Sequence, residues 1–360
     1  MKRRDFLKKA AIGTAAATAT IAAPAVIAGP KRIRWRMPTS WPKAFDTIYG
    51  GAETVADRVK AMTDGRFEII PYAGGELVGG LEVFDAVSQG TFQMGHTASY
   101  YYIGKNPAFA FDTAMPFGLN YRQQNAWLYN GGGIEQMRKI FSDFNIVNFP
   151  AGNTGAQMGG WFRKEVNSVA DLKGMKMRIP GLGGKVMNRL GVTVQVLAGG
   201  DIYPALERGV IDATEWVGPY DDDKAGFYKV AKFYYYPGWW EPAPTLSLYV
   251  NQKAWDSLPK EYQAIVSTAA AQANQQMMVD YDSKNPKALQ SLLKKGVQMR
   301  KYSDEIMLAA QKEAFSLYAE LAAADPKYKA IYDNWSSFKK DSDQWFSTAE
   351  TAYASFVFKS

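Results

Sequence analysis

The feature that most constrains the fold is a stretch of alternating strand-like and helix-like segments from Met175 to Trp216. Its apolar runs at Met175–Ile179, Val192–Leu197 and Val210–Thr214 predict short buried strands, and an amphipathic helix follows each of the first two. Strand–helix–strand–helix–strand order with short links predicts parallel strands joined by right-handed crossovers. Ligands of such open sheets bind beyond the carboxyl ends of the strands.

Charged residues lie at this predicted edge. Arg178 ends the first strand, and Glu215, followed by Trp216, ends the third. A guanidinium group there can bind a ligand carboxylate through two parallel hydrogen bonds, and a glutamate can hold a cation. Structural alternatives exist for both residues. Arg178 can pair with a structural acid, and Glu215 can form an ion pair with Arg178 in the absence of any ligand.

A second unit of the same order precedes this stretch. The sequence predicts its strands at Ile33–Met37, Arg66–Pro71 and Thr91–Gly95, and its helices at Thr47–Thr63 and Glu82–Gln89. The two units also align in sequence, and the alignment places His96 opposite Glu215. Two similar units predict two lobes that face each other across a cleft. The alternative is that two such units share this order by chance.

The rest of the chain completes the predicted organisation. We expect residues 146–163 to form strands that cross between the lobes. A helix is expected to follow the cap at 255–259 and run to 279, with further helices at 286–294, 304–324 and 342–358. The predicted domains are 1–28, an export signal; 29–152, mainly lobe 1; 153–250, mainly lobe 2 with the crossing strands; 251–341, helices returning across the lobes; and 342–360, a C-terminal aromatic helix.

The C-terminal helix is unusually aromatic. One stripe along it holds Trp345, Phe346, Ala349, Tyr353, Phe356 and Val357. A stripe this apolar has to be buried. It packs either on its own chain or on a partner subunit, and the sequence leaves both alternatives open.

The first 28 residues are typical of an export signal. Lys2-Arg3-Arg4-Asp5-Phe6-Leu7-Lys8 is a twin-arginine pattern, and Val26-Ile27-Ala28 offers a small-residue cleavage site. An ordinary Sec signal is the alternative, and both predict export.

The chain carries a formal net charge of +7, but the five basic residues and one acid of the signal account for +4, leaving +3. A charge this small does not favour nucleic acid as a partner.

Composition and spacing exclude several kinds of site. The chain has no Cys and a single His, His96, so thiolate and multi-histidine metal sites are excluded and a Ser-His-Asp hydrolase is disfavoured. The glycines of 181–184 follow a strand, but Val186 stands where a dinucleotide fingerprint needs its third glycine. A P-loop is excluded as well. We expect these glycines to let a ligand or the opposite lobe approach the backbone.

Further polar residues lie close to the predicted cleft. Glu241 follows Trp239 and Trp240 and provides a second acid in an aromatic setting. Its alternative role is that of a structural acid between the lobes. Asn153 and Gln157 lie on the crossing segment and offer neutral oxygen or amide contacts.

Three segments carry a family resemblance: 171–178 (DLKGMKMR), 203–216 (YPALERGVIDATEW) and 251–255 (NQKAW). Over nearly all of its mature length the chain resembles the DctP-type solute-binding proteins of tripartite ATP-independent periplasmic (TRAP) transporters. The resemblance implies an α/β, two-lobed periplasmic-binding-protein-like fold with crossing interlobe strands, a hinge helix and long C-terminal helices. It also implies a clamping arginine, which falls on Arg178.

The chain looks most similar to the binders of 2-oxo or 2-hydroxy monocarboxylates such as pyruvate or lactate. In that branch a metal ion bridges protein and ligand, and some members dimerise by exchanging a long helix near the C-terminus. The implied metal ligands are Gln157, Glu215, the Trp216 carbonyl and Glu241. The implied substrate contacts are Arg178, Asn153, Gln157, Tyr101 and Trp216.

We therefore expect a periplasmic solute-binding protein that delivers a small monocarboxylate to the membrane components of a TRAP transporter and catalyses no reaction. The alternative is an exported, lyase-like enzyme that uses Glu215 and Glu241 as acid and base. If both glutamates and a ligand carboxylate converge on Arg178, two negative charges remain in excess. All expected donors are oxygens, so we expect calcium, with sodium as second choice if Glu241 is protonated or points away.

Overall fold

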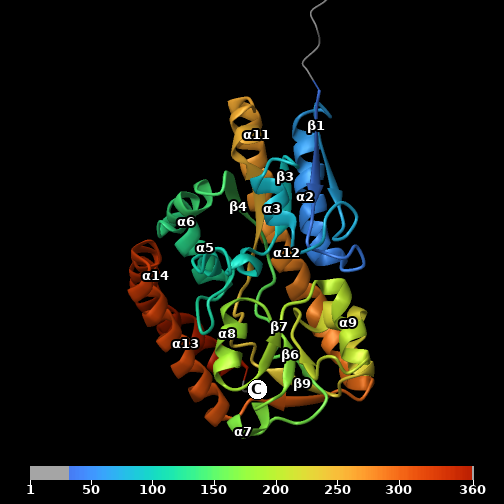
Figure 1. Cartoon of the computed structure of the whole chain (residues 1–360), viewed down its shortest axis with the longest axis vertical. Coiled ribbons are helices and arrows are strands. Elements are labelled where there is room, and N and C mark those ends of the chain that lie inside the picture. Colours follow the sequence, from blue (N-terminus) through green and yellow to red (C-terminus); the bar gives the residue numbers. More distant parts are fainter. Residues whose placement is uncertain (1–31, 359–360) are drawn as a thin grey trace, which may run out of the picture. The chain divides into compact units, whose positions relative to one another are not determined.

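A computed structural model describes residues 32–358. The export signal predicted at 1–28, with its twin-arginine pattern, lies outside this range. Strands gather in two regions, which form lobe 1 and lobe 2 and appear at the top and bottom of Figure 1. Among the described helices, none is both long and apolar enough to cross a bilayer.

Lobe 1 is built from two small sheets that meet edge to edge. Its strands are β1 (Ile33–Pro38), β2 (Phe67–Tyr72), β3 (Met94–Thr97), β4 (Ile146–Asn153) and β10 (Thr245–Asn251). β1 and β2 are parallel, whereas β10 lies antiparallel between β3 and β4. A parallel bridge between Thr39 and His96 links the two sheets. The helices of this lobe are α2 (Asp46–Met62), α3 (Val83–Ser88), α4 (Phe109–Thr113), α5 (Tyr121–Asn130) and α6 (Gly133–Ser142).

Lobe 2 contains a six-stranded sheet in the order β11-β9-β5-β8-β6-β7. Its strands are β5 (Trp161–Phe162), β6 (Lys176–Arg178), β7 (Thr193–Gln195), β8 (Ala213–Thr214), β9 (Phe233–Tyr236) and β11 (Gln298–Lys301). Its short helices are α7 (Val169–Leu172), α8 (Gly181–Arg189), α9 (Gly199–Glu207) and α10 (Pro219–Ala225). β6 runs parallel to both β7 and β8, which confirms the parallel unit predicted from the sequence, although each strand is shorter than predicted.

The chain crosses between the lobes several times. β4 belongs to lobe 1 and β5 to lobe 2, so residues 154–160 cross the gap once, and residues 237–244 return to β10. β10 precedes the predicted boundary at residue 250 but lies in lobe 1, because it pairs with both β3 and β4. After the short helix α11 (Gln252–Asp256), α12 (Lys260–Lys294) packs against α2 and β4 of lobe 1 and against α10 of lobe 2.

Two helix predictions are corrected by the structure. Residues 260–294 form one helix rather than two, although Pro286 lies inside it. A proline removes one backbone donor, but packing against both lobes keeps the helix continuous. The C-terminal helix begins at Pro326 rather than 342, because Asp325 caps it and Pro326 occupies its first turn. The helix predicted at 304–324 is confirmed as α13 (Asp304–Ala324).

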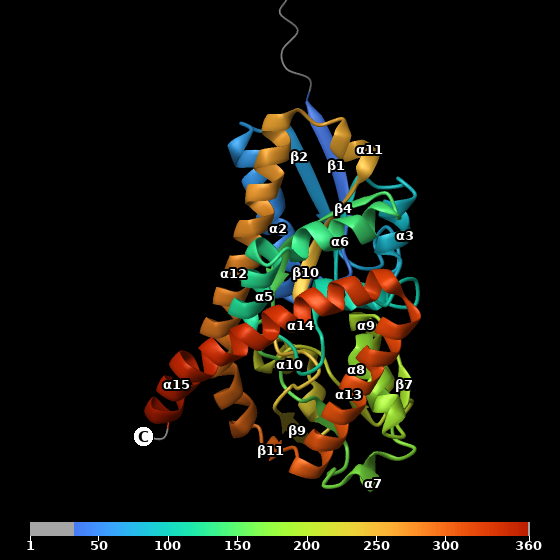
Figure 2. The ribbon, with the colours of Figure 1, turned by 90° about the vertical axis from the view of Figure 1, so that its left-hand side faces the viewer.

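The C-terminal helices run along both lobes. α13 packs against α7 and α8 of lobe 2, and α14 (Pro326–Phe346) packs against α5 and α6 of lobe 1. A π-helical turn at Ser347–Thr351 leads into α15 (Ala352–Val357), which projects away from the lobes in Figure 2.

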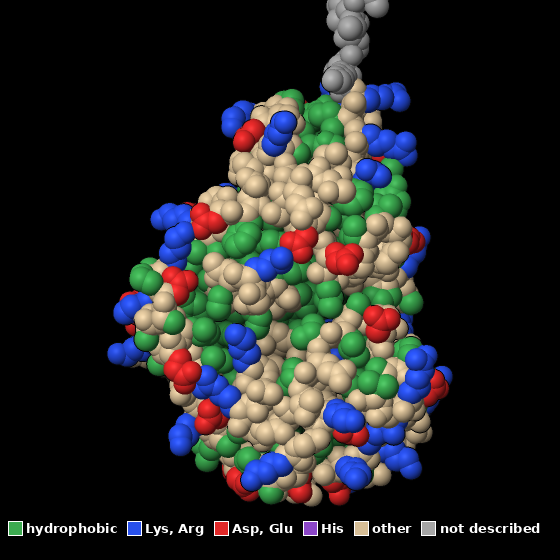
Figure 3. Space-filling view, viewed as in Figure 1, with side chains coloured by type: hydrophobic (Ala, Val, Ile, Leu, Met, Phe, Trp, Pro, Cys, Tyr) green, Lys and Arg blue, Asp and Glu red, His purple; other side chains and the backbone are tan. Residues whose placement is uncertain are grey.

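The two lobes share an apolar core. One cluster of buried side chains contains Trp41, Phe45 and Tyr100 of lobe 1 together with Trp216 and Tyr234 of lobe 2. The ring centroids of Phe45 and Trp216 are 5.1 Å apart. Figure 3 shows hydrophobic side chains gathered in the band between the lobes, with charges of both signs scattered above and below. The lobes are therefore in contact across the cleft.

Candidate ligand and metal site

The topology of lobe 2 brings Arg178 and Glu215 together. Arg178 ends β6 and is paired in register with Thr214 of the parallel strand β8, so Glu215 follows at the same edge of the sheet. The Glu215 amide donates to the Arg178 carbonyl at 3.2 Å. Because both strands are parallel, the two side chains leave the sheet at its carboxyl edge, as the sequence predicts.

Arg178 is almost completely buried, with 1% of its surface exposed. Its Nη1 forms an ion pair with Glu215 Oε1 and also donates to the Glu215 carbonyl at 3.2 Å. Its Nε donates to the Leu197 carbonyl at 3.1 Å, and the guanidinium carbon lies 5.4 Å from the Trp216 ring centroid. The ion pair that the sequence left as a structural alternative is therefore present. This ion pair uses only Nη1 of the guanidinium group and Oε1 of the carboxylate.

Several buried polar atoms around this ion pair have no hydrogen-bond partner among residues 32–358. They are Arg178 Nη2, Glu215 Oε2, Gln157 Oε1 and Trp216 Nε1. Buried polar groups in native proteins are almost always paired, because an unpaired one costs about 1–3 kcal/mol. Four such atoms around one ion pair make this place a candidate site for a polar ligand or an ion.

A small hollow opens beside these atoms. It has a volume of about 10 Å³, close to the minimum for one water molecule, and is lined by Trp41, Ile48, Tyr100, Tyr101, Thr154, Gln157, Trp216, Val217, Pro244 and Leu246. Both lobes contribute to this wall. Gly181 makes the close approach of the lobes possible, because it adopts a positive φ of 66° and a Cβ there would lie 2.7 Å from the Tyr100 ring.

The second acid, Glu241, is also buried, and its Oε2 accepts a hydrogen bond from the Tyr100 hydroxyl at 3.3 Å. Burial raises the pKa of Glu241 well above its usual range, and the nearby negative charge of Glu215 raises this pKa further. Burial also raises the pKa of Glu215 to about 7, although Arg178 opposes that rise. One buried arginine therefore does not fully compensate two buried glutamates.

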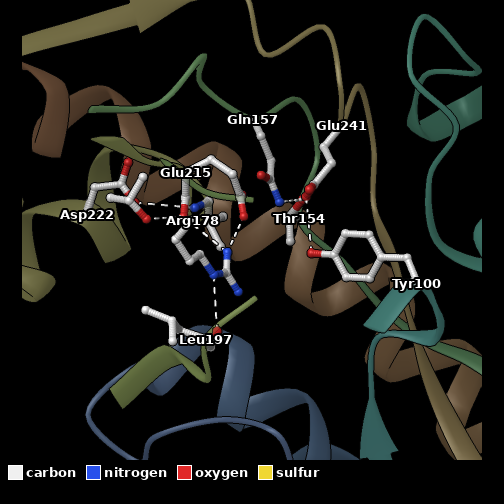
Figure 4. A network of polar contacts seen from close by, with 10 residues as sticks. Tyr100, Thr154, Gln157, Arg178, Leu197, Glu215, Asp222 and Glu241 are labelled. Carbon is white, nitrogen blue, oxygen red and sulfur yellow. Dashed lines mark hydrogen bonds and ion pairs between the residues drawn. The ribbon is translucent and has the colours of Figure 1, made fainter. Parts of the chain in front are cut away.

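The oxygens of this site suit a hard cation. Figure 4 shows the side chains of Gln157, Glu215 and Glu241 directed toward one another. Within the described residues, no cluster of three or more His, Cys, Asp or Glu side chains is arranged to bind a metal. A cation at this place would therefore depend on neutral oxygens as well as on the two glutamates. The unpaired Gln157 Oε1 and Glu215 Oε2 fit that role.

The structure gives the other predicted contacts different surroundings. Tyr101 and Trp216 line the hollow, and burial raises the pKa of Tyr101 to about 12, so its hydroxyl stays protonated. Asn153 instead uses its polar atoms within the chain. Its Nδ2 donates to the Ala243 carbonyl at 3.2 Å and to Thr245 Oγ1 at 3.3 Å, and its Oδ1 accepts from the Gly155 amide at 2.8 Å. Asn153 therefore secures the crossing segment.

Tyr100 was missed by sequence reasoning. It lies in a 3-10 turn, Ser99–Tyr102, directly after β3, and its hydroxyl reaches Glu241 on the segment 237–244 that returns from lobe 2. The available signal was a run of three tyrosines after a strand of the first unit, at the edge where ligands bind.

The single histidine has a structural role. His96 Nδ1 accepts from Trp41 Nε1 at 2.7 Å, its Nε2 donates to the Ala151 carbonyl at 3.0 Å, and burial lowers its pKa to about 4.

Comparisons with known proteins agree with this geometry. The family model of bacterial extracellular solute-binding proteins, family 7 (DctP), matches residues 39–325. A monocarboxylate 2-oxoacid-binding periplasmic protein of Nostoc sp. is 58% identical over 361 residues, which cover 99% of each chain.

Solved structures of similar proteins also resemble the chain. A TRAP transporter solute-binding protein of Bordetella bronchiseptica is 49% identical, with a TM-score of 0.90 over 91% of this chain and 98% of that one. Its crystal contains a mixed-occupancy dimer with copurified calcium and picolinate at the bound site. A TRAP periplasmic solute-binding protein of Pseudoalteromonas atlantica is 41% identical, with a TM-score of 0.88 over 90% and 99%, and has bound sodium and pyruvate.

These relatives are solute receptors of transporters, and none of them supports the alternative of a lyase. They account for the two lobes, the interlobe hollow and the periplasmic destination of the chain. The chain belongs to the DctP family of bacterial extracellular solute-binding proteins, the periplasmic receptors of TRAP transporters.

Proposed function

We propose that this receptor captures a small 2-oxo monocarboxylate such as pyruvate, or the related 2-hydroxy acid lactate, together with a metal ion. The observation that carries the proposal is a group of buried atoms around the Arg178–Glu215 ion pair that have no hydrogen-bond partner among residues 32–358: the donor Arg178 Nη2 and the acceptors Gln157 Oε1 and Glu215 Oε2. A ligand carboxylate satisfies the donor, and a cation satisfies the acceptors. The 2-oxoacid-binding relative from Nostoc supports this class of ligand.

The residues have distinct roles in this proposal. Arg178 Nη2 donates to the ligand carboxylate while Nη1 stays paired with Glu215. Gln157, Glu215, the Trp216 carbonyl and Glu241 would hold the cation, which supplies positive charge to the ligand oxygens when bound. Tyr101 and Trp216 enclose the ligand, and Tyr100 orients Glu241. Asn153 contributes indirectly, because it fixes the segment that carries Gln157.

Calcium is the first choice for this cation. Two glutamates and a ligand carboxylate against one arginine leave two negative charges, which a divalent ion neutralises. Unlike charges about 4 Å apart at an effective dielectric near 20 attract by roughly 4 kcal/mol, so the balance matters. Flexible all-oxygen sites suit calcium better than magnesium. Sodium becomes the better fit if Glu241 carries a proton, and burial favours that protonated form. Relatives with calcium and with sodium are both known.

We also propose that the receptor forms a homodimer through its C-terminal helix. Trp345, Tyr353 and Phe356 are 61%, 68% and 83% exposed, so these rings are not covered by their own chain within the described residues. Large exposed aromatic side chains on one helix are typical of a protein interface. The dimer of the Bordetella relative supports this proposal.

For export, the Arg3-Arg4 pair supports the twin-arginine route to the periplasm.

A ligand screen tests the proposed function. The unfolding temperature of the purified protein should rise with pyruvate or lactate in the presence of calcium, and rise less after chelation. Nuclear magnetic resonance of the added acid should show that it is bound and chemically unchanged. Conversion of the acid into a product would favour the lyase alternative, in which Glu215 and Glu241 act as acid and base.

A further inference from the structure

A second polar cluster joins the lobes outside the ligand hollow. Asp46 is the first residue of α2 in lobe 1, and Tyr220 and Lys224 lie on α10 in lobe 2. The Tyr220 hydroxyl donates to Asp46 Oδ2 at 3.0 Å, and Lys224 Nζ donates to Asp46 Oδ1 at 2.6 Å. One carboxylate of lobe 1 thus binds two donors of lobe 2.

Another lysine reinforces this cluster from α12. Lys284 Nζ donates to Thr47 Oγ1 at 2.9 Å and lies 5.0 Å from the Tyr220 ring centroid. Lys224 Nζ lies 4.4 Å from the same centroid, so the Tyr220 ring is in contact with two cations. The Tyr220 amide donates to Asn285 Oδ1 of α12 at 3.0 Å, which fixes the start of α10. We call Asp46, Tyr220, Lys224 and Lys284 the interlobe clasp.

The clasp is connected to the ligand site through its neighbours in sequence. Phe45 precedes Asp46, and its ring packs on Trp216 at 5.1 Å. Trp216 lines the hollow and lies four residues before Tyr220 on the segment that leads into α10. Opening the cleft would separate Asp46 from Lys224 and Phe45 from Trp216 in the same movement. Closing it would restore both contacts.

The position of the clasp also favours an effect on binding. The side chains of Asp46 and Lys224 are 54% and 32% exposed, and although partial burial opposes their ionisation, their mutual hydrogen bond and attraction outweigh it, so the pKa of Asp46 is lowered and the pKa of Lys224 is raised. Asp46 also lies in the first turn of a helix, where a negative charge is stabilised. Contacts made in the closed form and lost in the open form shift the population toward the closed form. This shift slows ligand release.

We propose that Asp46 is a positioning residue whose interlobe clasp holds the cleft closed over the ligand and so sets how long the ligand stays bound. The inference rests on the proposed function, because it assumes that a ligand is enclosed at Arg178. It assigns no ligand contact to Asp46. The effect is expected on ligand release rather than on ligand recognition.

Binding kinetics test the clasp with pyruvate and calcium as probes. Asp46→Asn and Lys224→Met should each increase the release rate and the Kd about fivefold, while the association rate changes less than about twofold. The double variant should be no weaker than Asp46→Asn alone, because loss of the Asp46 charge already breaks the ion pair that Lys224→Met removes. Glu68→Gln is the control, since Glu68 pairs with Lys60 and Arg34 inside lobe 1. It should leave the release rate unchanged.

A ligand-free readout keeps the clasp distinct from the proposed function. The chain has no cysteine, so fluorophores can be attached to cysteines introduced at the exposed positions Asp57 of lobe 1 and Lys229 of lobe 2. Energy transfer between them should show an open population raised about fivefold by Asp46→Asn. Failure of the wild-type protein to bind pyruvate would overturn the proposed ligand, whereas unchanged lobe separation and release rate in Asp46→Asn would overturn the clasp.

Discussion

Two regions of the molecule contrast with each other: in the described part of the chain, one buries polar atoms that have no polar partner, and the other exposes aromatic rings that have no apolar partner. At the carboxyl edge of β6 and β8, Arg178 Nη2 and Glu215 Oε2 are buried without a hydrogen bond to any residue of 32–358. On α14 and α15, the aromatic rings of Trp345 and Phe356 are exposed without cover. A polar atom removed from water needs a polar partner, and an apolar ring left in water needs an apolar one. This contrast supports the proposals of a charged ligand with a cation at the first region and of a partner subunit at the second.

The largest effect is expected at Arg178. Arg178→Ala leaves the buried Glu215 without its cation and removes the donor for the ligand carboxylate. Loss of one partner of a buried ion pair costs about 3–5 kcal/mol, so pyruvate binding should weaken by about a hundredfold or more. Isothermal titration calorimetry measures this change. Arg189→Ala is the control, because Arg189 forms surface ion pairs with Glu320 and Glu313. Equal affinity of Arg178→Ala and the wild type would remove Arg178 from the site.

A smaller effect is expected at Glu241. Glu241→Gln keeps an oxygen acceptor for the Tyr100 hydroxyl but removes one negative charge from the site. The preference for calcium over sodium should therefore fall by about tenfold, since a monovalent ion then comes closer to neutralising the remaining charge. Titrating both ions in the presence of saturating pyruvate measures the preference. An unchanged preference would show that Glu241 contributes no negative charge to the cation site.

The C-terminal helix should affect assembly and leave ligand binding nearly unchanged. Deletion from Ser342 onward, or replacement of Trp345, Tyr353 and Phe356 by serine, should convert a dimer into a monomer whose Kd for pyruvate stays within about twofold, since these rings lie on α14 and α15 outside the hollow. Light scattering reports the mass. A wild-type protein that is already monomeric would contradict the interface and would leave the exposed rings without explanation.

Asp221 separates burial from function. Its Oδ1 is buried without a partner among residues 32–358, as the site atoms are, but Asp221 lies on α10 where that helix meets α12, and its Oδ2 accepts from the Tyr281 hydroxyl of α12 at 2.7 Å. Burial raises the pKa of Asp221 from 3.8 to about 7. Between these values the folded state holds a proton that the unfolded state does not, so this group makes stability fall as pH rises from about 4 to 7.

Asp221→Asn should remove that part of the pH dependence without altering the Kd for pyruvate. The difference in unfolding free energy between pH 5 and pH 8 should shrink by on the order of 1–3 kcal/mol. Chemical unfolding at both pH values measures it. The same slope in variant and wild type would show that Asp221 is ionised in the folded protein throughout this range.

The sequence was sufficient to predict features that depend on the local pattern of strands and helices. The strand ends at Arg178 and Glu215 follow from apolar runs in a strand–helix repeat, and their meeting follows from parallel pairing. The sequence was not sufficient to predict features that depend on contacts between segments far apart in the chain. The contact of Tyr100 with Glu241 joins a residue of lobe 1 to one 141 positions later on the segment that returns from lobe 2, and no periodicity encodes it. Continuity of α12 through Pro286 depends in the same way on packing against both lobes.

The first region of the comparison rests on one claim, that a cation bridges the protein and its carboxylate ligand. Calorimetry of pyruvate binding to protein shown by elemental analysis to be metal-free tests it most directly, in a buffer without calcium or sodium. We predict binding at least about tenfold weaker than with calcium, restored when calcium is added back. Full affinity in the metal-free protein would contradict the bridging cation and leave Arg178 as the only anchor of the ligand.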